Sequence, residues 1–430
     1  MRAKTRSLRD GQVVEPNLVI VECPCPDGRC ARVHTKTPFM IKNTQQRNRA
    51  LMTATTAKSQ QIGPSGLKQN GHSAKLRRML DVRTYSGDAA TLSEFVGRVW
   101  RSTYADRMPL PVWDEAFFDW QLTWRSPDDR PYCIAVYDGD RLVGTLLGEE
   151  FGFRWFGSEH RGSQGSWLTV EPEYRRRGVG KLLLEELKKR HRERNADFQI
   201  GYGYQGSRLS LGPKFGKNHP QGTVSLRSLG FSARVLNPPA VADWELSRLE
   251  GWGARSLGWW QSRPERWNPD PHVRAYRSDD LPACLELAHG LLDHVDSGIV
   301  WDCERLAHQL DYKNYPRTLV SETDGHVDGF INYHLLDYLG RGTIRMAMID
   351  LFAAGELPRA SQVSLMKTAL FQMHNEGADV ALLLRTPCFP GSVLRRTGFF
   401  PRLPDQAILL TKMNPQFCPG SAKRFHLLWR

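Results

Sequence analysis

The chain has 430 residues, enough for two or three domains, and its 40% hydrophobic and 10% aromatic content is ordinary for a globular protein. It contains no run of about 18 apolar residues, so we expect no membrane span. The net charge of +13 is concentrated at one end, because residues 1–80 hold 15 Lys or Arg against four Asp or Glu. The rest is nearly neutral, and we therefore expect no specific nucleic-acid groove on the folded part.

Residues 1–78 are polar and basic, with few apolar residues in any period. Such a composition buries too little apolar surface to offset the entropy of ordering, so we expect a disordered basic tail. The side chains of Cys23, Cys25, Cys30 and His34 could bind zinc, but their spacing is not a paired C-x-x-C pattern, and we expect reduced thiols and no metal. The start of the chain lacks a secretory apolar region, which predicts a cytoplasmic protein; its Arg-rich character leaves an organelle transit peptide as the alternative.

Residues 79–236 alternate between helix and strand patterns and predict a first mixed α/β domain. Within it, residues 131–150 predict a β-hairpin. Two apolar runs are joined there at Asp138, Gly139 and Asp140, residue types that accept the turn's positive φ angles. Between the strand at 197–204 and the last helix lies a Gly- and Lys-bearing loop, 205–222, which we expect to border an acceptor site. The expected elements, in chain order, are a strand at 81–86, helices at 91–104 and 116–124, a hairpin at 131–150, a strand at 165–172, an amphipathic helix at 178–195, a strand at 197–204 and a short helix at 223–231.

Residues 237–272 hold five Pro and five Trp, which predicts a linker packed against its neighbours. Residues 273–414 then echo the first domain in the same order: 273–291 echoes 82–100, 322–330 echoes 137–145, and 395–400 echoes 227–232. Internal duplication is the economical explanation. We therefore expect two tandem mixed-sheet α/β domains, 79–236 and 273–414, and a C-terminal tail at 415–430.

One segment, VEPEYRRRGVGKLLLEEL at 170–187, carries recognisable chemistry. A strand ends at Pro172, a turn of Arg and Gly follows, and a helix is expected to start near Val179. A helix N-terminus presents unpaired N–H groups and partial positive charge. Gly178 and Gly180 leave that backbone open to a ligand, and Arg175, Arg176 and Arg177 add positive charge. The arrangement suits a pyrophosphate.

This segment resembles the signature of the GCN5-related N-acetyltransferase (GNAT) superfamily: Gln or Arg, two residues, Gly, one residue, Gly or Ala. Val170-Glu171-Pro172 before it and Leu229-Gly230-Phe231 after it resemble the same family. The resemblance implies acetyl-CoA or another acyl-CoA as co-substrate, no metal, and a strand that offers its free backbone to the pantetheine arm. The cofactor-binding candidates that it implies are Leu168, Val170, Arg175, Arg176, Arg177, Gly178, Val179, Gly180 and Lys181.

Catalytic groups are harder to assign. Acyl transfer to an amine needs a base for the amine and an acid for the leaving thiolate. Many members of the family have a Tyr four residues before the Gly of Leu-Gly-Phe, but Leu226 stands there. Tyr202 and Tyr204 on the strand at 197–204 are the candidate acids, and Glu149 and Glu150, on the hairpin, are the candidate bases.

The second domain has no matching loop, because residues 355–360 retain one Gly, contain Pro358 and lack the Arg cluster. We expect it to be degenerate. The leading hypothesis is an N-acyltransferase that transfers acetyl from acetyl-CoA to an amine of a small molecule or a protein. The alternatives are a non-catalytic acyl-CoA-binding or scaffold protein, and an acyltransferase with a longer acyl or an aminoacyl donor.

Overall fold

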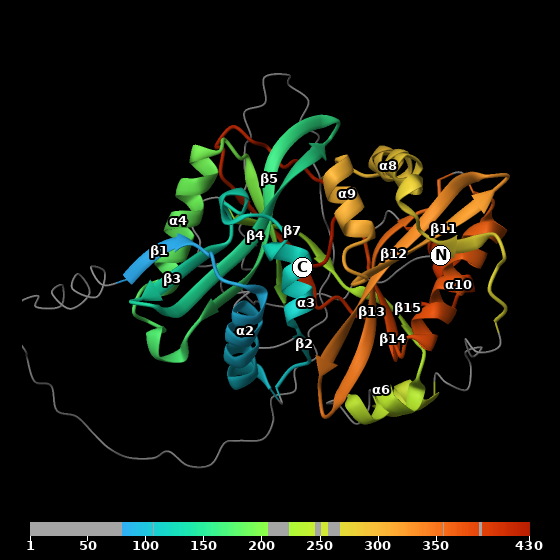
Figure 1. Cartoon of the computed structure of the whole chain (residues 1–430), viewed down its shortest axis with the longest axis horizontal. Coiled ribbons are helices and arrows are strands. Elements are labelled where there is room, and N and C mark those ends of the chain that lie inside the picture. The colour runs from blue at the N-terminus through green and yellow to red at the C-terminus, as the bar shows by residue number, and fades with distance from the viewer. Residues whose placement is uncertain are drawn as a thin grey trace, which may run out of the picture. The chain divides into compact units, whose positions relative to one another are not determined.

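The computed structural model describes residues 80–105, 107–204, 223–245, 251–256, 267–355, 357–386 and 389–430 (Figure 1). All of them belong to one compact unit, Leu67–Arg430. The predicted basic tail with its four possible zinc ligands and the predicted loop at 205–222 lie outside the described residues. Among the described helices, none has the length and apolar character needed to span a membrane.

The first sheet is built mainly from the chain up to residue 229. Its strands follow the order β1-β3-β4-β5-β6-β16-β7, and β10 pairs with the far end of β4. The bounds are β1 Leu80–Thr84, β3 Ile134–Asp138, β4 Arg141–Trp155, β5 Ser158–Val170, β6 Phe198–Tyr204, β7 Thr223–Leu229, β10 Ser297–Val300 and β16 Gln406–Lys412. The predicted hairpin at 131–150 is confirmed as β3 and β4.

Helices cover both faces of this sheet, because successive side chains along each strand point to opposite faces and both sets are apolar. Along β3, Ile134 and Val136 pack in one apolar cluster with Leu183 of α4. Ala135 and Tyr137 point the other way, into the cluster that includes α2. The helices of this half are α2 Ala89–Tyr104, α3 Glu115–Phe118 continued by a π-helical turn at Asp119–Thr123, and α4 Val179–Glu193, with 3-10 turns at Pro127–Asp129 and Pro172–Tyr174. Thus α2 and α4 lie on opposite faces.

The second sheet runs β15-β8-β14-β13-β12-β11-β9, with β2 added on β12. Its strands are β2 Leu110–Val112, β8 Phe231–Val235, β9 Val273–Ala275, β11 Pro316–Thr323, β12 His326–Leu339, β13 Thr343–Ala353, β14 Val380–Leu384 and β15 Phe400–Pro401. The helices of this half are α6 Pro238–Trp244, α8 Leu281–Gly290, α9 Cys303–Leu310, α10 Arg359–Asn375 and α11 Gly391–Arg396, with 3-10 turns at Ser278–Asp280 and Leu291–His294.

The two sheets exchange a strand. In the first sheet, the position beside β6 is filled by β16, from late in the chain, through antiparallel pairs from Gln406↔Tyr204 to Lys412↔Phe198. In the second, the position beside β14 is filled by β8, from Val380↔Val235 to Leu384↔Phe231. Each sheet also has a parallel pair next to the exchanged strand, β5 with β6 in the first and β13 with β14 in the second. In both sheets a parallel pair of strands is therefore followed by a strand from the other half, as an internal duplication would require.

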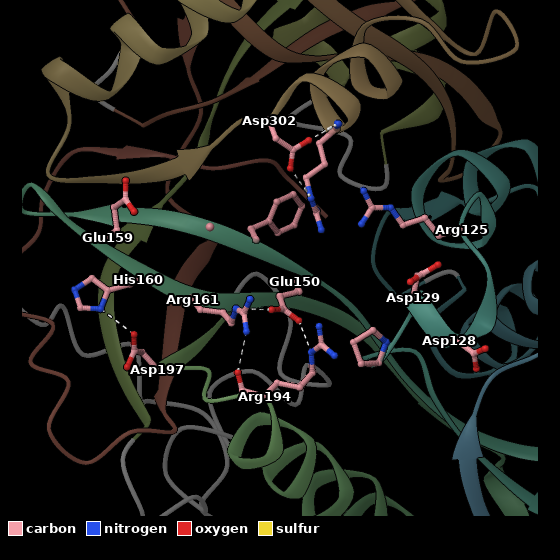
Figure 2. Close-up of a pocket in the computed structure, with 14 residues that line it drawn as sticks. Arg125, Asp128, Asp129, Glu150, Glu159, His160, Arg161, Arg194, Asp197 and Asp302 are labelled. Carbon is pink, nitrogen blue, oxygen red and sulfur yellow. Dashed lines mark hydrogen bonds and ion pairs between the residues drawn. The ribbon is translucent and has the colours of Figure 1, made fainter.

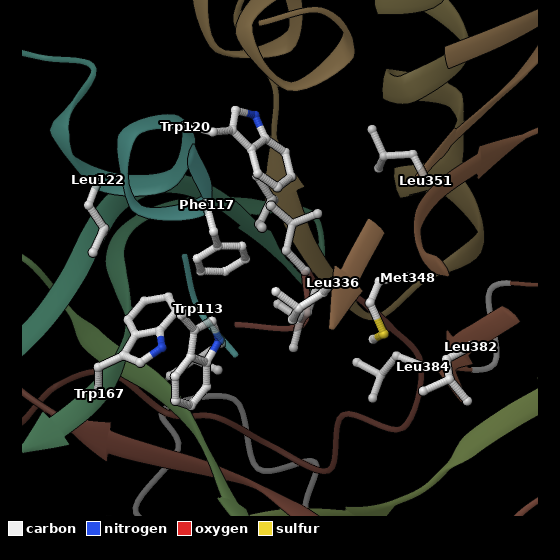
Figure 3. Close-up of a cluster of buried hydrophobic side chains, with 14 of the residues drawn as sticks. Trp113, Phe117, Trp120, Leu122, Trp167, Leu336, Met348, Leu351, Leu382 and Leu384 are labelled. Atoms are coloured by element: carbon white, nitrogen blue, oxygen red, sulfur yellow. The ribbon is translucent and has the colours of Figure 1, made fainter. Parts of the chain in front are cut away.

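One apolar core joins the two halves. Figure 3 shows Trp113, Phe117, Trp120 and Trp167 of the first half facing Leu336, Met348 and Leu382 of the second, all in one buried cluster. The aromatic residues around the second predicted helix are therefore mainly core. In the Trp- and Pro-rich 237–272 segment, Trp244 is buried, whereas Trp252 is 76% exposed.

Two expectations are wrong. The helix predicted at 223–231 is strand β7, which pairs antiparallel with β16; a partner strand from the other half decides the conformation, which local propensity cannot register. Residues 415–430 are not a tail, because Phe417, Phe425, Leu427 and Leu428 are buried. There β17, Phe425–His426, pairs with β10.

Candidate active site

A gap opens in the first sheet between β5 and β6. The two strands pair in parallel at only three positions, from Gly162↔Phe198 to Gln164↔Ile200. Beyond them the strands no longer pair, so residues 165–170 of β5 present a free backbone edge. A cavity of about 190 Å³ occupies the gap, lined by Trp100 and Tyr104 of α2 on one face and Leu184 of α4 on the other. Because α2 and α4 lie on opposite faces, the cavity passes through the sheet. Leu168, a predicted pantetheine contact, lines it as well.

The free edge of β5 carries a β-bulge. Thr145 of β4 pairs with Thr169 but Leu147 pairs with Ser166, so β5 has one extra residue there. Trp167 lies in the bulge with φ of 50°, a conformation unusual for a bulky residue. Bulges commonly re-aim backbone groups beside active sites. Its indole is 2% exposed, and the Nε1 atom has no hydrogen-bond partner among the described residues.

The loop that follows β5 leads directly into α4. Gly178 precedes the helix with φ of 89°, which favours glycine, and no side chain caps the helix. A Cβ added at Gly178 or Gly180 would meet no atom within 4 Å, so both glycines border open space. The first backbone bond to close the helix is from the Leu182 amide to the Gly178 carbonyl. The amides before Leu182 therefore face outward at the start of α4.

The three arginines of the loop differ in their contacts. Arg175 is anchored, since its guanidinium donates to the Val170 carbonyl at 3.2 Å and to the Thr103 hydroxyl at 2.7 Å. Arg177 lies over the Tyr174 ring. Arg176 is exposed, with φ of 63°. The loop thus combines one fixed arginine and two at the surface around the open glycines.

Glu171, at the start of this loop, is held in place by ion pairs. Its carboxylate accepts from Arg98 at 2.5 Å and lies 3.6 Å from Arg141. The hydrogen bond from Arg98 lowers the pKa of Glu171 below its usual range. The pairs tie the β5–α4 connection to α2 and to β4. This residue positions the loop.

Three of the catalytic candidates have different surroundings. Tyr202 and Tyr204 both line the gap. The Tyr202 hydroxyl donates to the Leu428 carbonyl at 2.7 Å, and burial raises the pKa of Tyr202 above its usual range. Glu149 lines neither the gap nor the cavity beside it; it is clamped between Arg305 at 2.9 Å and Arg430 at 3.0 Å. These two ion pairs occupy both of its carboxylate oxygens.

A second cavity, of about 170 Å³, adjoins the gap between the two sheets. It shares Trp100, Ser166, Tyr202 and Tyr204 with the gap. Its other walls come from both halves and include Asp405, just before β16. Sequence reasoning missed Asp405, because nothing in the local pattern shows that β16 joins the first sheet.

A larger, charged pocket of about 550 Å³ lies at the far end of β4 and β5, away from the loop (Figure 2). Its groups largely neutralise one another. Glu150 is paired with Arg161 at 2.9 Å and with Arg194 at 2.6 Å, and His160 contacts Asp197 at 2.9 Å. We assign no ligand to it. Among the described residues, no cluster of His, Cys, Asp and Glu is arranged to hold a metal ion.

The corresponding loop of the second half is closed. Gly355 has φ of 49°, but a Cβ there would already lie 3.0 Å from Leu287. Leu357 is 8% exposed and packs beside Gly329, and α10 begins after Pro358, which offers no N–H. This contrasts with the open start of α4.

Comparisons with known proteins agree with this geometry. Residues 94–201 match the model of the acetyltransferase (GNAT) family. A structure of N-myristoyltransferase from Saccharomyces cerevisiae with bound myristoyl-CoA superposes with a TM-score of 0.61 at 14% identity, covering 77% of this chain and 79% of that one. Another structure of that enzyme gives 0.61 at 13% identity over 81% and 85%. No curated protein sequence matches the chain significantly. The likeness to the solved structures shows the fold, and the family match shows that residues 94–201 resemble the acetyltransferases of the GNAT family.

Proposed function

We propose that this protein is an acyl-CoA-dependent N-acyltransferase with one donor site, in the gap between β5 and β6. The observation that carries the proposal is the joining of two features: an unpaired strand edge, and an open helix N-terminus immediately after that strand. A pantetheine arm carries amides that complete such an edge, and a pyrophosphate suits the outward amides of α4.

In the proposed complex the phosphates contact the backbone from Arg176 to Lys181, with the guanidinium groups around them. The pantetheine lies along Leu168 and Val170, and the thioester reaches the bulge at Trp167. An outward backbone N–H at that bulge would stabilise the negative charge that develops on the thioester oxygen. Tyr202 and Tyr204 of β6, which both line the gap, are the candidates to protonate the leaving thiolate.

The donor that we propose is acetyl-CoA, with a longer acyl-CoA as the competing donor, since the structurally similar enzyme has bound myristoyl-CoA. Purified full-length protein should release CoA thiol from acetyl-CoA in the presence of an amine library. Parallel reactions with myristoyl-CoA decide the chain length. Turnover of myristoyl-CoA alone would refute the acetyl donor and keep the acyltransferase.

A non-catalytic acyl-CoA-binding protein is the second candidate, favoured by the clamping of Glu149 and the engagement of Tyr202. Calorimetry separates the two. Micromolar binding of CoA without thiol release from any donor and amine would establish the binding protein. No binding of CoA at all would refute both the acyltransferase and the binding protein.

A further inference from the structure

The cavity beside the gap has a distinct chemical character. Aromatic rings are the commonest groups in its wall, and they come from both halves, among them Trp113, Phe231, Trp244, Tyr338 and Trp429. Several of these are fixed in place. Trp244 Nε1 donates to the Tyr338 carbonyl at 3.0 Å, and Trp429 Nε1 donates to Gln406 Oε1 at 3.2 Å. The rings thus form a preformed apolar surface next to the gap.

Asp405 is the single acidic side chain in this wall. Its Oδ1 atom is buried without a hydrogen-bond partner among the described residues. Burial raises the pKa of Asp405 above its usual range, although the nearby Arg402 opposes this. A buried carboxylate oxygen without a partner costs stability, so its presence calls for a ligand that supplies the missing donor.

The backbone around Asp405 is held firmly. The Asp405 amide donates to the Leu229 carbonyl at 3.1 Å, and the Arg402 amide donates to the Phe231 carbonyl at 2.8 Å. Between them, Gly230 lets the loop approach so closely that a Cβ there would lie 3.1 Å from the carbonyls of Arg402 and Leu403. The Leu-Gly-Phe segment therefore fixes the carboxylate beside Tyr204, whose strand partner is Gln406.

We propose that this cavity binds the acceptor, a primary amine on an apolar or aromatic body, and that Asp405 holds its ammonium group and takes its proton. This inference rests on the proposed function. An ammonium group is matched by a carboxylate and by aromatic faces together. The acyl chain of a long donor is the competing occupant, but it would bury the Asp405 carboxylate with no donor at all.

The step balances without another reactant. The ammonium loses a proton to Asp405, and the free amine nitrogen attacks the thioester carbonyl. A C–N bond forms as the C–S bond breaks; the nitrogen then loses its second proton, and the leaving thiolate takes up one proton. Asp405 afterwards releases its proton to water. Overall, an ammonium group and acyl-CoA give an amide, CoA thiol and one proton. Base catalysis of this kind contributes about 10²–10⁴-fold.

The test uses full-length protein and phenethylamine as the probe, with phenethyl alcohol as the uncharged probe of the same shape. Calorimetry in the presence of CoA should show phenethylamine binding, with affinity at least 10-fold lower in Asp405→Asn. Phenethyl alcohol should bind wild type and Asp405→Asn with the same affinity. The control is Asp324→Asn, which changes an exposed carboxylate in a turn at φ of 51°, where Asn is also accepted.

Kinetics give a second readout. With acetyl-CoA, kcat/KM for phenethylamine should fall about 100-fold in Asp405→Asn, and the acid limb of its pH profile should disappear. The charged and titratable groups that face Asp405 in the cavity are Arg402, Arg430, Tyr202, Tyr204 and Tyr338. A merely structural aspartate would lower stability when replaced, whereas this one, whose Oδ1 atom is buried without a partner among the described residues, should leave a protein at least as stable at pH 7.

The outcomes separate this inference from the proposed function. If CoA binds but phenethylamine does not, or binds equally well to Asp405→Asn, the acceptor site is overturned while the donor site stands. If decanoyl-CoA binds far more tightly than acetyl-CoA and displaces phenethylamine, the cavity belongs to the acyl chain and the inference is also overturned. If CoA itself does not bind, the proposed function is refuted, and the acceptor site that rests on it is refuted as well.

Discussion

Replacing Gly180 by Glu should remove CoA binding while stabilising the fold. Gly180 is the second residue of α4, without a positive φ, and a Cβ there meets no atom within 4 Å. A non-glycine residue in a helix gains about 0.5–1 kcal/mol, and an acid at a helix N-terminus gains about 0.3–1 kcal/mol. The unfolding free energy should therefore rise by about 1 kcal/mol.

CoA binding should change in the opposite direction. The carboxylate would stand where the phosphates are proposed to approach, and at least two charge-assisted amide bonds would be lost. At about 1.5 kcal/mol each, they sum to about 3 kcal/mol, which is roughly a 100-fold loss of affinity. Calorimetry with CoA and thermal unfolding of the same samples measure both effects.

The matched control is Gly391→Glu. Gly391 is the first residue of α11, in the second half, and a Cβ there also meets no atom within 4 Å. This variant carries the same charge at a comparable helix start, and it should bind CoA normally. Wild-type affinity in Gly180→Glu would refute the assignment of the phosphates to α4, whatever happened to stability.

Three further predictions concern stoichiometry, pH and the C-terminal segment. One CoA should bind per chain, since Leu357 and Leu287 occupy the loop of the second half; a calorimetric stoichiometry near two would contradict this. Glu171→Gln should lower stability at pH 7, and the difference from wild type should close as the pH falls below about 4.5, because a lowered folded-state pKa contributes stability above the unfolded value and loses it on acidification; a pH-independent difference in chemical denaturation would show that the charge is not responsible. Phe425→Ala should cost about 3–5 kcal/mol, as expected for a fully buried ring; a loss under 1 kcal/mol in denaturant titration would mean that this segment can leave the core.

Local sequence predicted the helix start at the proposed donor site. The helix expected at 178–195 is α4, and its start, with Gly178 and Gly180, lies where the pattern placed it. A helix start is fixed by a few neighbouring residues, so its signal is local. The predicted phosphate contacts themselves stay a prediction.

The acceptor side depends on contacts that no local pattern contains. Asp405 lies beside Tyr204 only because β16 crosses from the second half into the first sheet. Thr223–Leu229 was predicted as helix for the same reason, since its partner is also β16. Trp167 at φ of 50° gave no signal either, because a tryptophan does not mark a position of positive φ. Pairings between residues that are distant in the chain decide all three.

The exchange of β8 and β16 has a consequence for how the chain is synthesised. When β6 emerges from the ribosome, its sheet partner β16 is still about 200 residues away. At about 5–20 residues per second, the edge of β6 waits roughly 10–40 s for that partner. During that time β8 also lacks β14, so two strand edges are open to pairing with other chains. Expression of residues 79–236 alone should therefore give an aggregating product, and co-expression with the second half should rescue it. Translation speed between β8 and β16, rather than the stability of the finished fold, would then set the yield of native protein.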